Sequence, residues 1–397
     1  MEEAIRISAA SPAPGQADLK SPPRFEHALE LLLTHRGNPA AEIDRLLADD
    51  PNNVVGHCLR AAVIVCADAV AVRSSLAQSV AAIEAACPDP QHPARRHAAA
   101  AQAWLEGDSS LAIERYSAIL KDRPRDIVAL VVAHALDFRL DRRRMLRDRV
   151  ARILPEWDAT VPHYASVLAM YAFGLEENGQ YRRAEKIARR ALAVDPRHPG
   201  AIHVIAHVME MQGRAREGLA FLAETEPAWL EGTGFSVHLA WHRALFQLDL
   251  DDLTAALATY DAQIASVRAP GLSVLADAAS LLWRFQLRNI DVDGRWRVLA
   301  DRWEVQGLAG ARPFYVVHAM MAFSAAGRGS ASVRLFKVLR ETNATGGAGL
   351  LPEEALALPF CERCWRLFAM TLRHALIGSR ACASSRIAAV AASPSAT

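Results

Sequence analysis

Two pairs of histidines stand out because the members of each pair are four positions apart. His203 and His207 lie in AIHVIAHVMEMQG, and His238 and His242 lie in FSVHLAWHRALFQL. On a helix, side chains at positions i and i+4 share one face, with Cβ atoms about 5–6 Å apart, so one metal ion could bind both imidazoles of a pair. Two pairs on neighbouring helices predict a histidine-rich site for a divalent transition metal ion, for which Fe, Co, Mn and Zn are all chemically suitable.

The same imidazoles are open to other interpretations. They could transfer protons, or hydrogen bond to a polar ligand without a metal ion. A single HxxxH pair can also be two ordinary core or solvated imidazoles. The metal hypothesis is favoured here because the two pairs are expected on successive helices that line one groove.

Three further residues are candidates for proton transfer or for completing the metal shell. Glu210 lies on the same helical stripe as the first histidine pair, and Glu177 follows Glu176 at the end of the preceding helix. His318 lies in PFYVVHAMMAF, on a later helix. We therefore expect the four paired histidines to bind the metal ion, and His318, Glu177 and Glu210 to have catalytic roles.

The remaining histidines carry weaker signals. His57, and His134 together with Asp137, lie on predicted inner helices and are secondary candidates for the site. Six others are expected to be structural: His27, His35, His92, His97, His198 and His374.

Two other segments have competing interpretations. Trp283 and Arg284, with Asp277 nearby, could stack on a flat ring, although a Trp packed in the core is the simpler explanation. The basic run DFRLDRRRMLRDR is interleaved with Asp and predicts a solvated helix face. The sequence contains no phosphate-binding loop and no HExxH or GxSxG motif, so nucleotide hydrolysis and those hydrolase mechanisms have no support.

A repeat of helix pairs must position these side chains. Gly179 and Gly213 are 34 residues apart, which is the period of tetratricopeptide repeats. Gly107 and Pro124 are 17 residues apart, as are Gly179 and Pro196. Gly permits the turn between two helices and Pro ends the second helix. We predict an all-α, tetratricopeptide-type solenoid of about six to eight helix pairs, with a concave groove lined by the first helix of each pair.

Composition sets the outer limits of the protein. Of its 397 residues, 52% are hydrophobic, and 45 basic residues balance 44 acidic ones for a net charge of +1. This balance argues against nucleic acid or an anionic membrane surface as the main partner. No run approaches the ~20 apolar residues of a membrane span and no signal sequence is evident, so we expect a soluble cytoplasmic protein.

The ends of the chain differ from its body. Residues 1–24 and 379–397 are rich in Ser, Ala and Pro, and predict a flexible N-terminal arm and a flexible C-terminal tail. The solenoid is expected over residues 25–378. Six cysteines are dispersed along the chain, and the CxxC of Cys361 and Cys364 lacks the second pair of a zinc site, so we expect reduced thiols.

The sequence resembles the tetratricopeptide repeat protein 38 family over most of residues 25–345. The resemblance is carried by four strings in the same order, VLAMYAFGLEENGQYRRAEKIARRALAVDPRHPGAIHVIAHVMEMQGR, FSVHLAWHRALFQLDL, DAASLLWRFQL and HAMMAFSAAGR. The paired histidines, His318, Glu176 and Glu177 belong to these motifs. VPHYASVL departs from the glycine-rich, PGYGYVLG-like string of the family, because His163 replaces a small residue.

The resemblance implies two different functions. The chain is similar to the bacterial repeat proteins of toxoflavin-type azapteridine biosynthesis, which implies a metal-dependent oxidase that uses dioxygen on a fused nitrogen heterocycle on the way to a 1,2,4-triazine. Most members of the family imply the alternative, a non-catalytic scaffold that binds a peptide or a partner protein. A groove rich in His and Glu with apolar neighbours favours a small enclosed ligand, because a peptide-binding groove would favour Asn, Lys and Arg.

Overall fold

The computed structural model describes residues 23–67, 72–230, 234–308, 311–345, 359–364 and 366. The chain forms two compact units. Among the described residues, the first comprises 23–33 and 38–136, and the second comprises 34–37 and those from 137 onward. The predicted arm and tail lie outside the described residues, except that helix α1 (Pro23–Thr34) already begins at Pro23.

The first unit consists of helices in antiparallel pairs. Helix α3 packs against α4, and α5 packs against α6. Its helices after α1 are α2 (Pro39–Asp49), α3 (Val54–Ala67), α4 (Arg73–Ala86), α5 (Pro93–Leu105), α6 (Ser109–Asp122) and α7 (Ile127–Arg139), the last of which continues to the start of the second unit.

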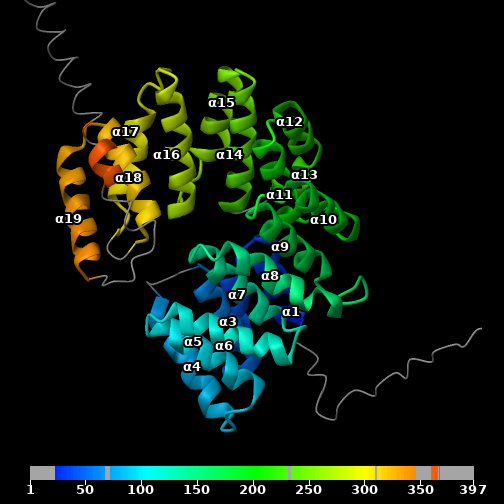
Figure 1. The fold of residues 1–397 in the computed structure, drawn as a ribbon. Helices are drawn as coiled ribbons and strands as arrows, with labels where there is room; N and C mark the ends of the chain where they lie inside the picture. The colour runs from blue at the N-terminus through cyan, green and yellow to red at the C-terminus, as the bar shows by residue number, and fades with distance from the viewer. Residues whose placement is uncertain are drawn as a thin grey trace, which may run out of the picture. The chain divides into compact units, whose positions relative to one another are not determined.

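The second unit continues the pattern and contains all four paired histidines. Figure 1 shows its helices following one another in chain order from green to orange. They are α8 (Arg143–Ile153), η2 (Leu154–Glu156), α9 (Tyr164–Glu176), α10 (Tyr181–Val194), α11 (Pro199–Met211), α12 (Ala215–Glu224), α13 (Glu226–Trp229), α14 (Gly234–Asp249), α15 (Leu253–Thr259), the π-helical turn η3 (Tyr260–Ile264), α16 (Leu272–Leu287), α17 (Arg295–Glu304), α18 (Pro313–Ala325) and α19 (Gly329–Thr345).

The turns inside the pairs explain the glycines of the repeat. Gly107, Gly179, Gly213 and Gly327 have φ angles of 92°, 71°, 67° and 68°, in the left-handed region that glycine enters without a Cβ penalty. Each of them follows the first helix of a pair: α5, α9, α11 or α18. The 34-residue step therefore repeats one turn conformation.

Small residues let the paired helices approach closely. Ala112, Ala184 and Ala191, in the second helices of their pairs, are completely buried. A Cβ on Gly174 of α9 would lie only 2.7 Å from the Cα of Arg147 on α8, so only glycine fits at that crossing. No strand occurs among the described residues. The chain is an all-α protein built from tetratricopeptide-type helix pairs, as the repeat predicted.

The basic run of α8 is not wholly solvated. Arg149 is 5% exposed, and its Nε donates to Oδ2 of Asp137 at 2.7 Å. The Asp137 residue is completely buried. The expectation of a solvated face is therefore wrong for Arg149, because the run supplies one guanidinium to a buried carboxylate. Within the described ranges, no helix combines the length and apolar character needed to cross a membrane.

Candidate metal centre

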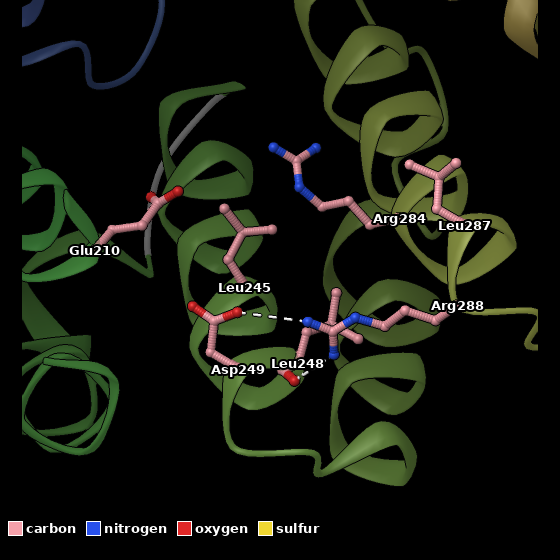
Figure 2. Close-up of a pocket in the computed structure, with 7 residues that line it drawn as sticks. All are labelled: Glu210, Leu245, Leu248, Asp249, Arg284, Leu287 and Arg288. Carbon is pink, nitrogen blue, oxygen red and sulfur yellow. Dashed lines mark hydrogen bonds and ion pairs between the residues drawn. The ribbon is translucent and has the colours of Figure 1, made fainter. Parts of the chain in front are cut away.

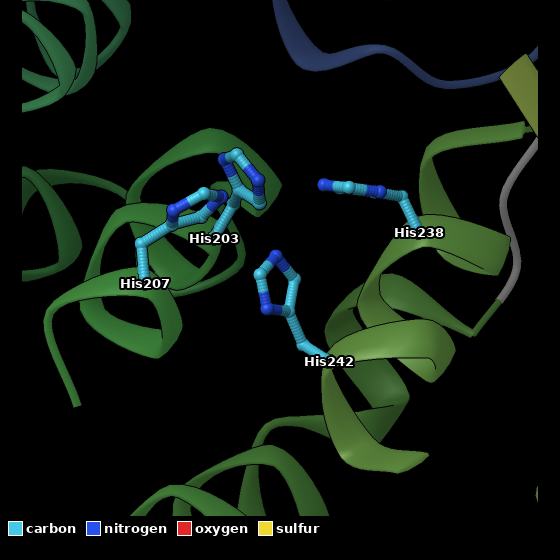
Figure 3. Close-up of side chains that lie close together, drawn as sticks. All are labelled: His203, His207, His238 and His242. Carbon is cyan, nitrogen blue, oxygen red and sulfur yellow. The ribbon is translucent and has the colours of Figure 1, made fainter. Parts of the chain in front are cut away.

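Helices α11 and α14 bring the four paired histidines together. His203, His207, His238 and His242 each offer a ring nitrogen that lies within 4.8 Å of the corresponding nitrogens of the other three. Figure 3 shows two rings extending from each helix toward one shared space. The helices pack against each other, and the i, i+4 spacing places both imidazoles of each helix on the packed face. The two pairs therefore converge in space, as expected for pairs on successive helices that share one site.

Local sequence fixes where α11 begins. Pro199 occupies its first turn, and the ring of His198 caps the helix by accepting from the backbone N–H of Ala201 at 3.3 Å. His198 also hydrogen bonds to the hydroxyl of Ser166 at 3.0 Å. This capping gives His198 the structural role expected of it, and sets the phase that directs His203 and His207 toward α14.

Carboxylates hold two of the imidazoles by their Nδ1 atoms. Nδ1 of His242 lies 2.9 Å from Oε2 of Glu210, and Nδ1 of His238 lies 3.1 Å from Oδ2 of Asp277 on α16. A carboxylate that accepts from Nδ1–H fixes the tautomer with a lone pair on Nε2, which is the form that binds a metal ion. Nδ1 of His207 lies 3.8 Å from Oε1 of Glu176, an electrostatic contact longer than a hydrogen bond.

Two ring nitrogens of the cluster are buried and have no hydrogen-bond partner. They are Nε2 of His203 and Nε2 of His242, and the His242 residue is 0% exposed. A buried nitrogen without a partner costs the free energy of its lost hydration, so such atoms in a folded protein call for an explanation. A metal ion bound by these nitrogens would satisfy them, and the donor set therefore fits a transition metal ion.

The protonation states of three of the four rings also fit a metal site. Burial, reinforced by His238, lowers the pKa of His207 to about 3. Burial and the neighbouring imidazoles lower the pKa values of His203 and His242 well below the ordinary value. Only His238 has a raised pKa, because Asp277 and Glu210 outweigh the effect of its burial. Three of the four rings are thus neutral, and neutral imidazole is the ligand form.

Glu176 is a further carboxylate with an unusual environment. Burial, together with repulsion from Glu177 and Glu210, raises the pKa of Glu176 to about 7. Its Oε2 is buried without a hydrogen-bond partner, while its Oε1 faces His207. A carboxyl that titrates near neutral pH beside a metal-binding imidazole is suited to accept or release a proton.

Aromatic rings surround the imidazoles. The ring of Trp241 stacks on His238 with centroids 5.3 Å apart, and Phe235 contacts His203 at 5.0 Å. The ring of His35 stacks on Phe235 at 4.7 Å. Phe235 lies on α14 in the FSVHLAWHRALFQL string, three residues before His238, but no role was predicted for it. No motif or spacing pointed to His35 as part of this site, because His35 reaches the cluster only through tertiary packing.

Two predicted site residues lie outside the four-histidine cluster. Glu177 faces Nη1 of Arg143 at 3.9 Å, and the neighbouring Glu176 is the one that approaches His207. His318 has its Nδ1 2.7 Å from the backbone oxygen of Phe314 in its own helix. Glu210 is the predicted carboxylate that joins the cluster, through His242.

Two of the secondary candidates, His57 and Asp137, are engaged elsewhere. His57 hydrogen bonds to the hydroxyl of Ser79 at 3.2 Å and to the backbone oxygen of Pro51 at 2.9 Å. Asp137 pairs with Arg149. His163 stands at the N-terminal cap of α9 with a left-handed backbone, φ 65°. Cys361 and Cys364 are buried free thiols, and burial raises both pKa values to about 12.

Comparison with known proteins finds solved structures of low sequence identity. No family model matches the chain. The type IV pilus biogenesis factor PilW is 14% identical with a TM-score of 0.31, covering 65% of this chain and 96% of its own. The APC/C hetero-tetramer Cut9-Hcn1 is 12% identical with a TM-score of 0.40, and the match covers 86% of this chain and 62% of the other. The TPR domain of P58(IPK) is 13% identical with a TM-score of 0.20, covering 87% and 98%.

Proposed function

We propose that this protein is a metal-dependent oxidoreductase that holds one divalent transition metal ion between α11 and α14. The observation that supports it is the convergence of four imidazoles within 4.8 Å, two of them with buried Nε2 atoms that have no partner. The reaction class comes from the resemblance of the sequence, which implies an oxidase that uses dioxygen on a small nitrogen heterocycle in toxoflavin-type 1,2,4-triazine biosynthesis. A bound ion would supply Lewis acidity and a site for one-electron chemistry.

The residues of the cluster would have different roles. His203, His207, His238 and His242 would bind the ion. Glu210 and Asp277 hold the tautomers of their partner histidines by accepting from Nδ1. Glu176, with its pKa near 7, holds or releases a proton next to His207.

The number of ligands favours particular metals. Four imidazoles fill the tetrahedral shell that Zn prefers in closed structural sites, whereas catalytic sites keep a position open. Fe, Co or Mn accept additional ligands, so these ions would leave room for substrate or dioxygen beside the same four rings. An oxidase therefore requires one of them in preference to Zn.

Metal analysis of the purified full-length protein tests the proposal. We expect about one equivalent of Fe, Co or Mn after expression in metal-replete medium, and a loss of most of it in His207→Ala. His27→Ala is the matched control, because His27 is exposed and belongs to the first unit. A wild-type protein without stoichiometric metal would contradict the proposal, and full retention of metal by His207→Ala would contradict the ligand set.

A partner-binding scaffold is the second candidate, and the tetratricopeptide-type helix pairs favour it. Such repeats present extended surfaces to peptides and proteins. A stoichiometric protein partner recovered with a metal-free wild-type chain would support the scaffold. If the His207→Ala protein also retained that partner, partner binding would not depend on the histidine cluster.

A further inference from the structure

A pocket opens beside the histidine cluster. It has a volume of about 210 Å³ and lies between helices α11, α14 and α16. Figure 2 shows Glu210 and Arg284 on opposite sides of it, with Leu245 between them. The lining consists of three leucines and four charged residues, namely Glu210, Leu245, Leu248, Asp249, Arg284, Leu287 and Arg288. Since Glu210 also hydrogen bonds to His242, the pocket adjoins the proposed metal centre.

Three of the four charges already have partners. Glu210 is bound to His242, and Asp249 lies 3.6 Å from Arg288. Arg288 also donates to the backbone oxygen of Leu248 at 2.5 Å. Arg284 differs from these three, because it contacts a backbone oxygen and an aromatic ring.

Arg284 is held in place without a carboxylate. Its Nη1 donates to the backbone oxygen of Ser280 at 3.1 Å, and its guanidinium lies over the ring of Trp241 at 5.2 Å from the centroid. No carboxylate lies within ion-pair distance of Arg284 among the residues that the structure describes. Stacking on Trp orients a guanidinium while its edge donors stay available for a ligand.

We propose that this pocket binds the organic part of the substrate, and that Arg284 binds the oxyanion of a small molecule with a single negative charge. The planar guanidinium matches a carboxylate or a deprotonated ring oxygen, and the leucines contact the apolar body of the ligand. Glu210 and Asp249 line the same pocket, so a ligand with more negative charge, such as phosphate, would be repelled more strongly than a monoanion.

The size of the pocket agrees with a ligand of this class. Its volume is about 210 Å³. This is below the ~300 Å³ at which pockets for drug-sized ligands begin. A single ring with one acidic group therefore suits the pocket.

Titration calorimetry with benzoate tests the inference on the full-length protein. Benzamide, a neutral molecule of the same shape, and inorganic phosphate are the comparison ligands. We expect benzoate to bind at least tenfold more tightly than either, and Arg284→Gln to weaken benzoate binding by at least tenfold, since a charge-assisted hydrogen bond is lost. Arg284→Lys keeps the positive charge but loses the planar guanidinium. Its affinity for benzoate should lie between those of the wild type and Arg284→Gln.

Arg243→Gln is the matched control. Arg243 also stacks on a tryptophan, Trp229, at 4.8 Å, but it pairs with Glu226 and does not line the pocket. We expect it to bind benzoate as the wild type does. Equal binding of benzoate and benzamide, no benzoate binding to the wild type, or full binding by a folded Arg284→Gln protein would overturn the inference.

The inference rests on the proposed function only in taking the ligand to be the substrate of the metal centre. Benzoate is therefore titrated into chelator-treated protein, in which no ion can bind the carboxylate, and metal content is measured on the same preparation before treatment. Binding that depends on Arg284 in a protein that never held metal would sustain the pocket and overturn the metal function. If the protein held one equivalent of metal but bound benzoate independently of Arg284, the metal function would be sustained and the pocket inference overturned.

Discussion

His242 and Glu210 form a partly buried pair in which Nδ1 of the imidazole lies 2.9 Å from Oε2 of the carboxylate. The His242 residue is 0% exposed, and its Nε2 has no hydrogen-bond partner. Glu210 thus fixes one ring nitrogen while the other faces His203 and His207, with ring centroids 5.3 and 4.5 Å away. A carboxylate on α11 thus holds the orientation of an imidazole on α14.

Glu210→Gln is expected to weaken metal binding by about 10- to 100-fold, because loss of a carboxylate behind a ligating histidine lowers the basicity of that histidine and loosens its orientation. Affinity is measured by competition with a chromophoric chelator. Glu217→Gln is the control, since Glu217 is an exposed residue paired with Arg214 on the neighbouring α12. Equal affinities for Glu210→Gln and the wild type would show that Glu210 does not position His242.

Asp277→Asn is expected to act in the same way through His238, whose Nδ1 lies 3.1 Å from Asp277. The double variant Glu210→Gln, Asp277→Asn should lose affinity by roughly the product of the two single effects, because the carboxylates act on different histidines. The same competition assay measures all three proteins. A double variant no weaker than either single variant would indicate that only one of the two histidines binds the ion.

Removal of the metal ion should lower the melting temperature of the protein. An ion that binds only the folded chain stabilises it in proportion to the logarithm of its concentration over the dissociation constant, so about 100-fold excess contributes ~2.7 kcal/mol. Differential scanning fluorimetry with and without a chelator measures the shift. In the double variant His203→Ala, His242→Ala, the chelator should not change the melting temperature. A shift as large as that of the wild type would mean that the ion binds outside the histidine cluster.

Gly218→Ala should destabilise the second unit, although alanine normally favours a helix by about 1 kcal/mol over glycine. A Cβ at this position of α12 would lie 2.3 Å from Cζ of Phe246 on α14, and Phe246 is completely buried and cannot move aside. Overpacking of this kind costs about 1–3 kcal/mol. Urea unfolding measures it, with Gly294→Ala as the control because a Cβ on Gly294 meets nothing within 4 Å. A stability equal to that of the control would refute the close contact.

Asp126 should make the first unit sensitive to acid. Burial alone would raise its pKa, but His97 at 3.1 Å and the backbone N–H of Ala129 outweigh burial and hold the pKa below its ordinary value. A depressed pKa contributes stability that is present above the unfolded value, about 4, and is lost as pH falls through the folded value. Asp126→Asn should therefore be less stable than the wild type at pH 7.

The difference between the two proteins should narrow as the pH approaches 3. Urea midpoints of the first unit across this range measure the effect. Asp122→Asn is the control in the same unit, because Asp122 is an exposed partner of Arg96. A constant difference in urea midpoint between Asp126→Asn and the wild type from pH 7 to pH 3 would rule out a depressed pKa of Asp126.

Features that depend on short-range geometry could be predicted from the order of the residues alone. The 34-residue step between Gly179 and Gly213 predicts the paired helices, because a left-handed turn residue and a fixed helix length recur together. The i, i+4 spacing places His203 with His207, and His238 with His242, on single helix faces whatever the rest of the chain does. These predictions are independent of how one helix packs against the next.

Tertiary packing selected the neighbours that those faces meet. Glu176 approaches His207 and Glu177 does not, although they are adjacent in sequence, because a helix turns about 100° per residue and only one of the two side chains can face α11. Asp277 reaches His238 across 39 residues of chain. His318 remains hydrogen bonded within its own helix. Burial, which lowers the pKa of His207 and isolates Nε2 of His242, exists only once α11 and α14 have packed, since it is a property of the whole core and of no single segment.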